Sequence, residues 1–162
     1  MSEHVVVLKT TLARLLAAYK MTVPSNEQVP MYFEKAHQEL WAFVKQHHLK
    51  VIGPHMTIWH QGPEVMVNEV VEVTFEIDAA VPGAGEIQVY TLPETQVASF
   101  VHEGKFDEFQ IGHQILLEWI AENGFRATGG YREIYLKHDP GDLSDSATKI
   151  QCPVEKNHNK QS

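Results

Sequence analysis

The chain has a single cysteine, Cys152, and it lacks the residue runs that mark several protein classes. A lone cysteine cannot form an internal disulfide, which fits a reducing compartment. No apolar run approaches the ~18 residues of a membrane-spanning helix. The N-terminus, Met-Ser-Glu-His, lacks the basic start and apolar stretch of a signal peptide. We therefore expect a cytoplasmic protein without a membrane partner.

Basic charge is also scarce. The 162 residues include 13 Lys and Arg against 21 Asp and Glu, a net charge of −8, and no basic run. Nucleic-acid binding needs cationic side chains that neutralise phosphates, so we expect no direct nucleic-acid contact. A chain of this length also leaves little room for a fused DNA-binding module. Hydrophobic residues make up 43%, enough for the packed core of one domain.

Motifs for metals and cofactors are missing as well. None of the ten histidines belongs to a His-Glu-x-x-His motif, and Cys152 has no second cysteine with which to bind zinc. There is no phosphate loop, no serine nucleophile elbow and no dinucleotide fingerprint, for which Gly83-Ala84-Gly85 is too short. The sequence thus predicts no metal, no cofactor and no catalytic residue of these enzyme classes.

The chain does contain an internal repeat. Residues 37–44 resemble residues 113–120, which lie 76 positions later, and the same spacing pairs Trp59 with Tyr135. We predict a tandem duplication of a strand-helix-strand-strand module, copy one spanning about 1–81 and copy two about 85–155. Together the copies form a single domain over 1–155, followed by a flexible polar tail over 156–162.

Alternation of apolar residues and turn signals predict the same order of elements in each copy, and hence an α+β fold. Strands are expected over 5–9, 55–61, 70–78, 86–92, 95–102, 131–137 and 148–154, and helices over 30–47 and 107–122. Residues 12–20 have a helix-forming composition, whereas the duplication equates them with the strand over 95–102. We predict a strand there, because tertiary context overrides local propensity.

Five runs in copy two carry a family resemblance. They are Leu-Pro-Glu-Thr-Gln-Val-Ala-Ser (92–99), His-Glu-Gly-Lys-Phe (102–106), Leu-Glu-Trp-Ile-Ala-Glu-Asn-Gly (117–124), Arg-Glu-Ile-Tyr-Leu (132–136) and Thr-Lys-Ile-Gln-Cys-Pro-Val (148–154). These runs resemble the GyrI-like family, which includes effector-binding domains of AraC-type and multidrug-responsive regulators and also stand-alone proteins. The resemblance implies antiparallel sheets related by a pseudo-twofold axis, both helices on one side, and a ligand groove between the copies. It also implies binding of small, often cationic and aromatic, compounds.

Glu133 matches the glutamate that many family members place in their pocket. Along a strand, Glu133 and Tyr135 share one face, and the repeat makes Trp59 the counterpart of Tyr135. If the pseudo-twofold axis passes near these strands, the three side chains converge. A desolvated carboxylate amid aromatic rings favours a lipophilic cation. Further aromatic candidates for the ligand site are Trp41, Tyr32 and Tyr90.

Two other arrangements remain open at this point. Glu133 could lie exposed on an edge strand and pair with Arg132 or Lys137. Ile134 and Leu136, on the face opposite Glu133, would form a homodimer surface if nothing covers them.

The function predicted first is a small-molecule-binding protein that takes up lipophilic, cationic aromatic compounds. It would act by sequestering its ligand or through a partner regulator in trans. One alternative is a hydrolase of a reactive small molecule, as the resemblance implies for some members, with Glu133 as general base and Tyr135 as hydrogen-bond donor. A second alternative is a protein-interaction inhibitor of the gyrase type, acting through an acidic surface.

Overall fold

The computed structural model describes residues 5–62, 64–103, 109–137 and 147–157. The helix start expected at Asp107 and the residues of the tail from 158 onward lie outside these ranges. At the beginning of the expected tail, Lys156 instead belongs to the last strand, where it pairs with Phe125.

Nine strands and two α-helices make up the described chain and confirm the α+β class. In chain order they are β1 (Val7–Thr11), β2 (Arg14–Ser25), the 3₁₀ helix η1 (Asn26–Gln28), α1 (Val29–Gln46), β3 (Met56–Trp59), β4 (Val67–Glu76), β5 (Ile87–Leu92), β6 (Thr95–Glu103), α2 (Phe109–Glu122), β7 (Phe125–Ala127), β8 (Tyr131–Lys137) and β9 (Ala147–Lys156). The described helices include none that is both long and apolar enough to span a membrane.

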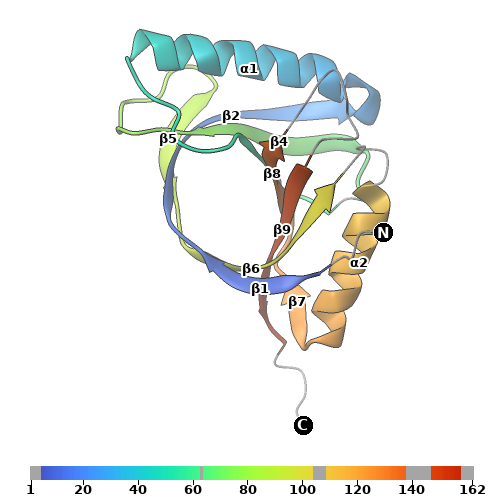
Figure 1. Cartoon of the computed structure of the whole chain (residues 1–162). Helices are drawn as coiled ribbons and strands as arrows, with labels where there is room; N and C mark the ends of the chain where they lie inside the picture. The colour runs from blue at the N-terminus through green and yellow to red at the C-terminus, as the bar shows by residue number, and fades with distance from the viewer. Residues whose placement is uncertain (1–4, 63, 104–108, 138–146, 158–162) are drawn as a thin grey trace.

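The strands form one strongly curled antiparallel sheet with the order β1-β6-β9-β8-β3-β4-β2-β5, and β7 pairs with the end of β9 (Figure 1). Pairing of β3 with β8 in the middle joins the two halves of the chain into a continuous sheet. The family resemblance implied more than one sheet. The structure instead has a single sheet, because β3 pairs with β8 and joins the two halves.

The conflict over residues 12–20 is resolved in favour of a strand. β2 covers Arg14–Ser25 and pairs with β4 on one side and β5 on the other. A helix there would leave the backbone donors and acceptors of both neighbours unpaired, so the sheet outweighs the helical propensity of its Leu and Ala residues.

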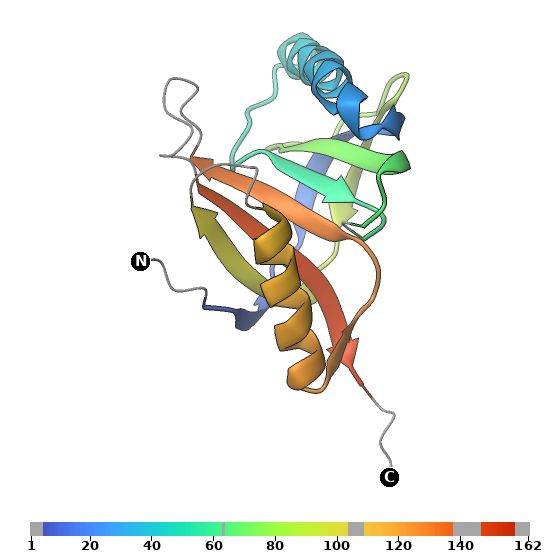
Figure 2. The ribbon, with the colours of Figure 1, turned by 90° about the vertical axis from the view of Figure 1, so that its right-hand side faces the viewer.

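Helix α1 packs through a stripe of apolar residues. Ala36, Leu40 and Phe43 are buried and contact Val73 and Phe75 of β4 in one core cluster. Helix α2 contributes Leu116 and Ile120 to a second cluster and lies over β6 and β9 (Figure 2). Each helix thus covers its own half of the sheet by its amphipathic face.

A third apolar cluster lies on the other face of the sheet, inside the curl. It consists of Leu16, Met56, Ile58 and Ile134, with Tyr90 and Leu92 packed against it. Ile134 is therefore buried, and only Leu136 is exposed. The association surface was expected only if nothing covers these residues, and the burial of Ile134 removes that condition. Met56 is its register partner on β3, and curling of the sheet brings Leu16 of β2 into the same cluster.

Candidate functional site

Glu133 lies in the middle of the sheet. Its strand, β8, is flanked by β3 and β9, with Glu133 opposite Thr57 on one side and Ile150 on the other. Residues paired across strands point to the same face, and Ile150 belongs to the cluster under α2. We call this the outer face. The glutamate is only 6% exposed, so it is not an exposed residue of an edge strand.

The partner of Glu133 is Tyr135, on the same face. The Tyr135 hydroxyl lies 2.9 Å from Glu133 Oε1 and 3.0 Å from Thr57 Oγ1. With one proton and a carboxylate beside it, the hydroxyl donates to Glu133 and accepts from Thr57. Burial nevertheless raises the pKa of Glu133 to about 7, and the hydrogen bond from Tyr135 opposes this rise. No ion pair joins Glu133 to another described residue.

Aromatic rings form a row beside this carboxylate, from one helix to the other. Phe33 of α1 lies 5.8 Å from Trp59, Trp59 stacks on Tyr131 at 5.8 Å, and Tyr131 meets the edge of His113 at 4.4 Å, measured between ring centroids. Burial, and then His102, lowers the pKa of His113 to about 4, so this imidazole is neutral at neutral pH. The row offers flat apolar surface and no positive charge.

Two buried polar atoms near the row lack a hydrogen-bond partner among the described residues: Trp59 Nε1 and Glu69 Oε2. The indole N–H of Trp59 favours the charged form of Glu133, but its geometry falls outside that of a hydrogen bond. Burial raises the pKa of Glu69, whose charge in turn raises that of Glu133. The outer face therefore holds a second buried carboxylate close to the first.

Sequence reasoning missed Glu69, although a signal was present. In β4 the buried residues Val71, Val73 and Phe75 alternate along one face, and extending that alternation backwards reaches Glu69. The residue was overlooked because a glutamate near a strand end is usually solvated.

The other aromatic candidates make no hydrogen bond to Glu133 among the described residues, although Tyr32 packs against the cluster that contains Trp59. Trp41 is 48% exposed and contacts Phe75 and His55 at the edge of α1. Tyr32 is half-buried against the cluster under α2. Tyr90 pairs with Leu16 in the sheet and points to the inner face, so the structure does not bring it to Glu133.

The Tyr135–Glu133 hydrogen bond predicts the effect of Tyr135→Phe. Because the hydroxyl stabilises the carboxylate, its loss should raise the pKa of Glu133 further above 7, measured by NMR titration of ¹³C-labelled glutamate carboxyls. Tyr32→Phe, on the half-buried ring of α1, is the control and should leave this pKa unchanged. An unchanged pKa in Tyr135→Phe would show that the hydroxyl does not act on Glu133.

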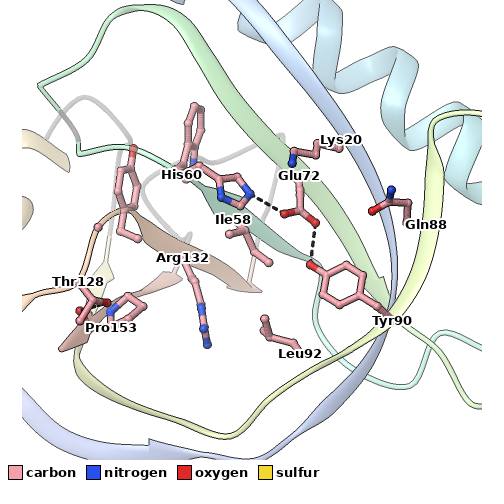
Figure 3. Close-up of a pocket in the computed structure, with 13 residues that line it drawn as sticks. Lys20, Ile58, His60, Glu72, Gln88, Tyr90, Leu92, Thr128, Arg132 and Pro153 are labelled. Carbon is pink, nitrogen blue, oxygen red and sulfur yellow. Dashed lines mark hydrogen bonds and ion pairs between the residues drawn. The ribbon is translucent and has the colours of Figure 1, made fainter. Parts of the chain in front are cut away.

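The inner face of the sheet carries a cavity of about 570 Å³ (Figure 3). Glu72 lies in its wall, with Oε2 2.5 Å from His60 Nε2 and Oε1 accepting from the Tyr90 hydroxyl at 2.6 Å. Arg132 lines the same cavity, since it faces opposite to Glu133 on β8. Neither Glu133 nor Tyr135 lines it.

Within the described ranges, no group of three or more His, Cys, Asp or Glu side chains is arranged to hold a metal ion. The site chemistry available on the outer face is therefore that of buried carboxylates, a tyrosine hydroxyl and aromatic rings.

Solved structures with this fold are known. The C-terminal domain of EcmrR has a TM-score of 0.84 and 22% identity, covering 94% of this chain and 98% of that one. SAV2435 bound to tetraphenylphosphonium has a TM-score of 0.62 and 14% identity over 95% of this chain and 94% of that one. A hydrolase encoded by lin2189 from Listeria innocua has a TM-score of 0.62 and 11% identity, with 93% and 91% covered. At these identities the likeness shows the fold alone.

No curated protein matches the chain significantly. A family model does match, over residues 5–155, which include every strand of the curled sheet except the last residue of β9. The chain therefore belongs to the family of the GyrI-like small molecule binding domain.

Proposed function

We propose that the chain binds lipophilic, cationic aromatic molecules on the outer face of the sheet, with Glu133 as the residue that selects for positive charge. The observation that carries this proposal is a carboxylate only 6% exposed, beside a row of aromatic rings and without a described cationic partner. A neutral ligand of the same shape would gain the ring contacts and leave the carboxylate unpaired.

The energetics favour such a ligand. A buried carboxylate without a counter-charge is costly, which is why Glu133 holds its proton up to about pH 7. A bound cation stabilises the ionised form, and aromatic rings such as Trp59 and Tyr131 add cation–π attraction of ~0.5–2 kcal/mol. The unpartnered Oε2 of Glu69 would gain from the same charge.

The proposal includes a duplicated origin for the fold, with both helices on one side of the sheet. The strand order supports it, because β1-β6-β9-β8 mirrors β5-β2-β4-β3 about the β3–β8 pair. Thr57 and Glu133, 76 residues apart, are direct partners at that centre. The pairing Val73–Thr57–Glu133–Ile150 supports a common side for the two helices, because Val73 belongs to the cluster under α1 and Ile150 to the cluster under α2. Within the proposal, Glu133, with Glu69 close to it, then serves a groove shared by the two halves.

The fold neighbours are compatible with this assignment. The solved structure of SAV2435 has tetraphenylphosphonium bound, and this compound is a lipophilic aromatic cation. Within the proposal, this chain acts by sequestering such a compound or through a partner regulator.

Titration with tetraphenylphosphonium tests the proposal. At pH 8, where Glu133 is ionised, Glu133→Gln should weaken binding measured by calorimetry at least about tenfold, because a charge-assisted contact is lost. The wild-type affinity should also fall about tenfold per pH unit below 7, since protons compete with the cation for the carboxylate. Glu39→Gln, on the exposed side of α1, is the control. Equal affinity of the wild type and Glu133→Gln would refute the role of Glu133.

The hydrogen bond between Tyr135 and Glu133 also favours a second candidate, hydrolysis. A carboxyl with a pKa of about 7 is suited to general-base catalysis near neutral pH, and the adjacent hydroxyl could donate to a substrate. Benzoylcholine, a cationic aromatic ester, separates the two functions in the same assay. The binding proposal expects the ester to be recovered intact, whereas benzoate formed by the wild type and not by Glu133→Gln would establish the hydrolase.

A further inference from the structure

Arg132 lies on the inner face of the sheet and has no partner of opposite charge among the described residues. It is 8% exposed, and neither a hydrogen bond nor an ion pair joins its guanidinium to another described residue. A guanidinium carries five N–H donors, and burying them without acceptors is costly. Figure 3 shows the side chain extending into the cavity from β8, where Arg132 is the register partner of Ile58 on β3.

The one carboxylate in the wall of this cavity does not neutralise Arg132. Both oxygens of Glu72 are engaged, one by His60 at 2.5 Å and the other by the Tyr90 hydroxyl at 2.6 Å. Lys20, which pairs with Glu72 across β2 and β4, adds another positive charge to the lining.

More cations lie on the same face. The register places Lys149 beside Ile134 of the inner cluster and Arg14 beside Leu92, a lining residue. Arg14 has a distant partner, Glu76 at 4.0 Å. Burial lowers the pKa of Lys149, and the charges of Lys9 and Arg14 lower it further. Burial likewise lowers the pKa of Arg132, with Arg14 acting in the same direction and Tyr90 against it. Within the cavity lining, two cationic side chains, Lys20 and Arg132, face the single carboxylate of Glu72.

The rest of the lining is mixed. Trp59 and Tyr131 of the aromatic row reach its edge, and Gln88 and Thr128 add polar groups to its apolar and aromatic residues. Ile58 comes from β3, whereas Leu92 and the ring of Tyr90 come from β5 (Figure 3). A volume of about 570 Å³ lies within the range of small-molecule sites. Shape and charge together suit a molecule with an apolar body and one anionic group.

We propose that the inner cavity is a second binding site, for a small organic anion with an apolar body, and that Arg132 holds its anionic group. Carboxylates match the fork of a guanidinium, which donates two parallel N–H bonds to the two oxygens. The site lies on the face opposite Glu133, so one domain binds ligands of opposite charge on the two sides of β8.

Calorimetric titration of the full chain with 1-naphthoate, and with neutral 1-naphthamide, tests this site. The wild type should bind the anion at least about tenfold more tightly than the amide, because only the anion pairs with the guanidinium. Arg132→Met should remove that preference. Arg126→Met is the matched control, because Arg126 is exposed on β7, where it pairs with Glu155, and it should retain the preference.

Comparison of the two ligands on the wild type stands even if Arg132→Met does not fold. Equal affinity of the wild type for anion and amide, absence of naphthoate binding up to millimolar concentration, or an unchanged preference in Arg132→Met would each overturn the site. Glu133→Gln separates it from the outer-face proposal. That variant should leave the naphthoate affinity within about threefold, and a larger gain would locate the anion on the outer face instead.

Discussion

Replacing Glu133 with glutamine should stabilise the ligand-free protein by about 3 kcal/mol at pH 8 and leave it almost unchanged near pH 4.5. The ordinary pKa of the carboxyl, 4.5, applies to the unfolded chain, and the folded value is about 7. As pH rises between these values, the unfolded state loses its proton while the folded state keeps it. Stability is therefore present in full below pH 4.5 and is lost on the way to pH 7. Glutamine mimics the protonated carboxyl and does not titrate.

Urea denaturation at pH 5 and pH 8 measures this effect. The difference between wild type and Glu133→Gln should grow with pH, while the exposed Glu39→Gln should follow the wild type at both. Saturating tetraphenylphosphonium should raise the free energy of unfolding of the wild type at pH 8 and change that of Glu133→Gln little, because a ligand stabilises only the state that it binds. A variant less stable than the wild type at pH 8 would mean that Glu133 already has a charge partner.

Gly130→Ala should destabilise the protein by about 2–4 kcal/mol, the second large effect. Gly130 has φ of +70°, a conformation that disfavours side chains, and a Cβ there would collide with the backbone carbonyl of Trp59. The clash falls beside the Trp59–Tyr131 pair of β3 and β8, so the aromatic row and the position of Glu133 are disturbed together.

Gly85→Ala provides the comparison for that variant. Gly85 has φ of +59° with no atom within 4 Å of a built Cβ, so alanine there carries only the conformational cost of about 1 kcal/mol. The free energy of unfolding measured by urea denaturation should be clearly lower for Gly130→Ala than for Gly85→Ala. The affinity for tetraphenylphosphonium should fall in Gly130→Ala alone. Equal stabilities of the two variants would show that the backbone between β3 and β8 shifts to accommodate the added Cβ without a large energetic cost.

The sequence predicted local structure correctly wherever the periodicity of its apolar residues matches the face that is buried in the fold. Periodicity and turn signals predicted the helix over 30–47, observed as α1, and alternation predicted that Glu133 and Tyr135 share a face. The strand β2 was predictable only through the internal repeat, because its composition alone favours a helix.

The placement of inner-face residues could not be worked out from the sequence. Tyr90 was a candidate for the ligand site and lies on the face opposite Glu133, and Ile134, an association residue only if uncovered, is buried. Alternation shows which residues of one strand share a face. It does not show which residues of the neighbouring strand lie on that same face, or whether the sheet curls. Arg132 was considered only as a surface partner of Glu133 for the same reason.

The sequence by itself determined the class of fold and the family and singled out Glu133, because these rest on periodicity and on motifs read along the chain. Only the tertiary structure decided that Glu133 is buried without a described cationic partner, that Glu69 lies close to it, and that Arg132 faces a cavity. The physical reason is that burial and charge pairing depend on strand neighbours far apart in sequence. Thr57 meets Glu133 and Ile58 meets Arg132 only when β3 and β8 pair at the centre of the curled sheet.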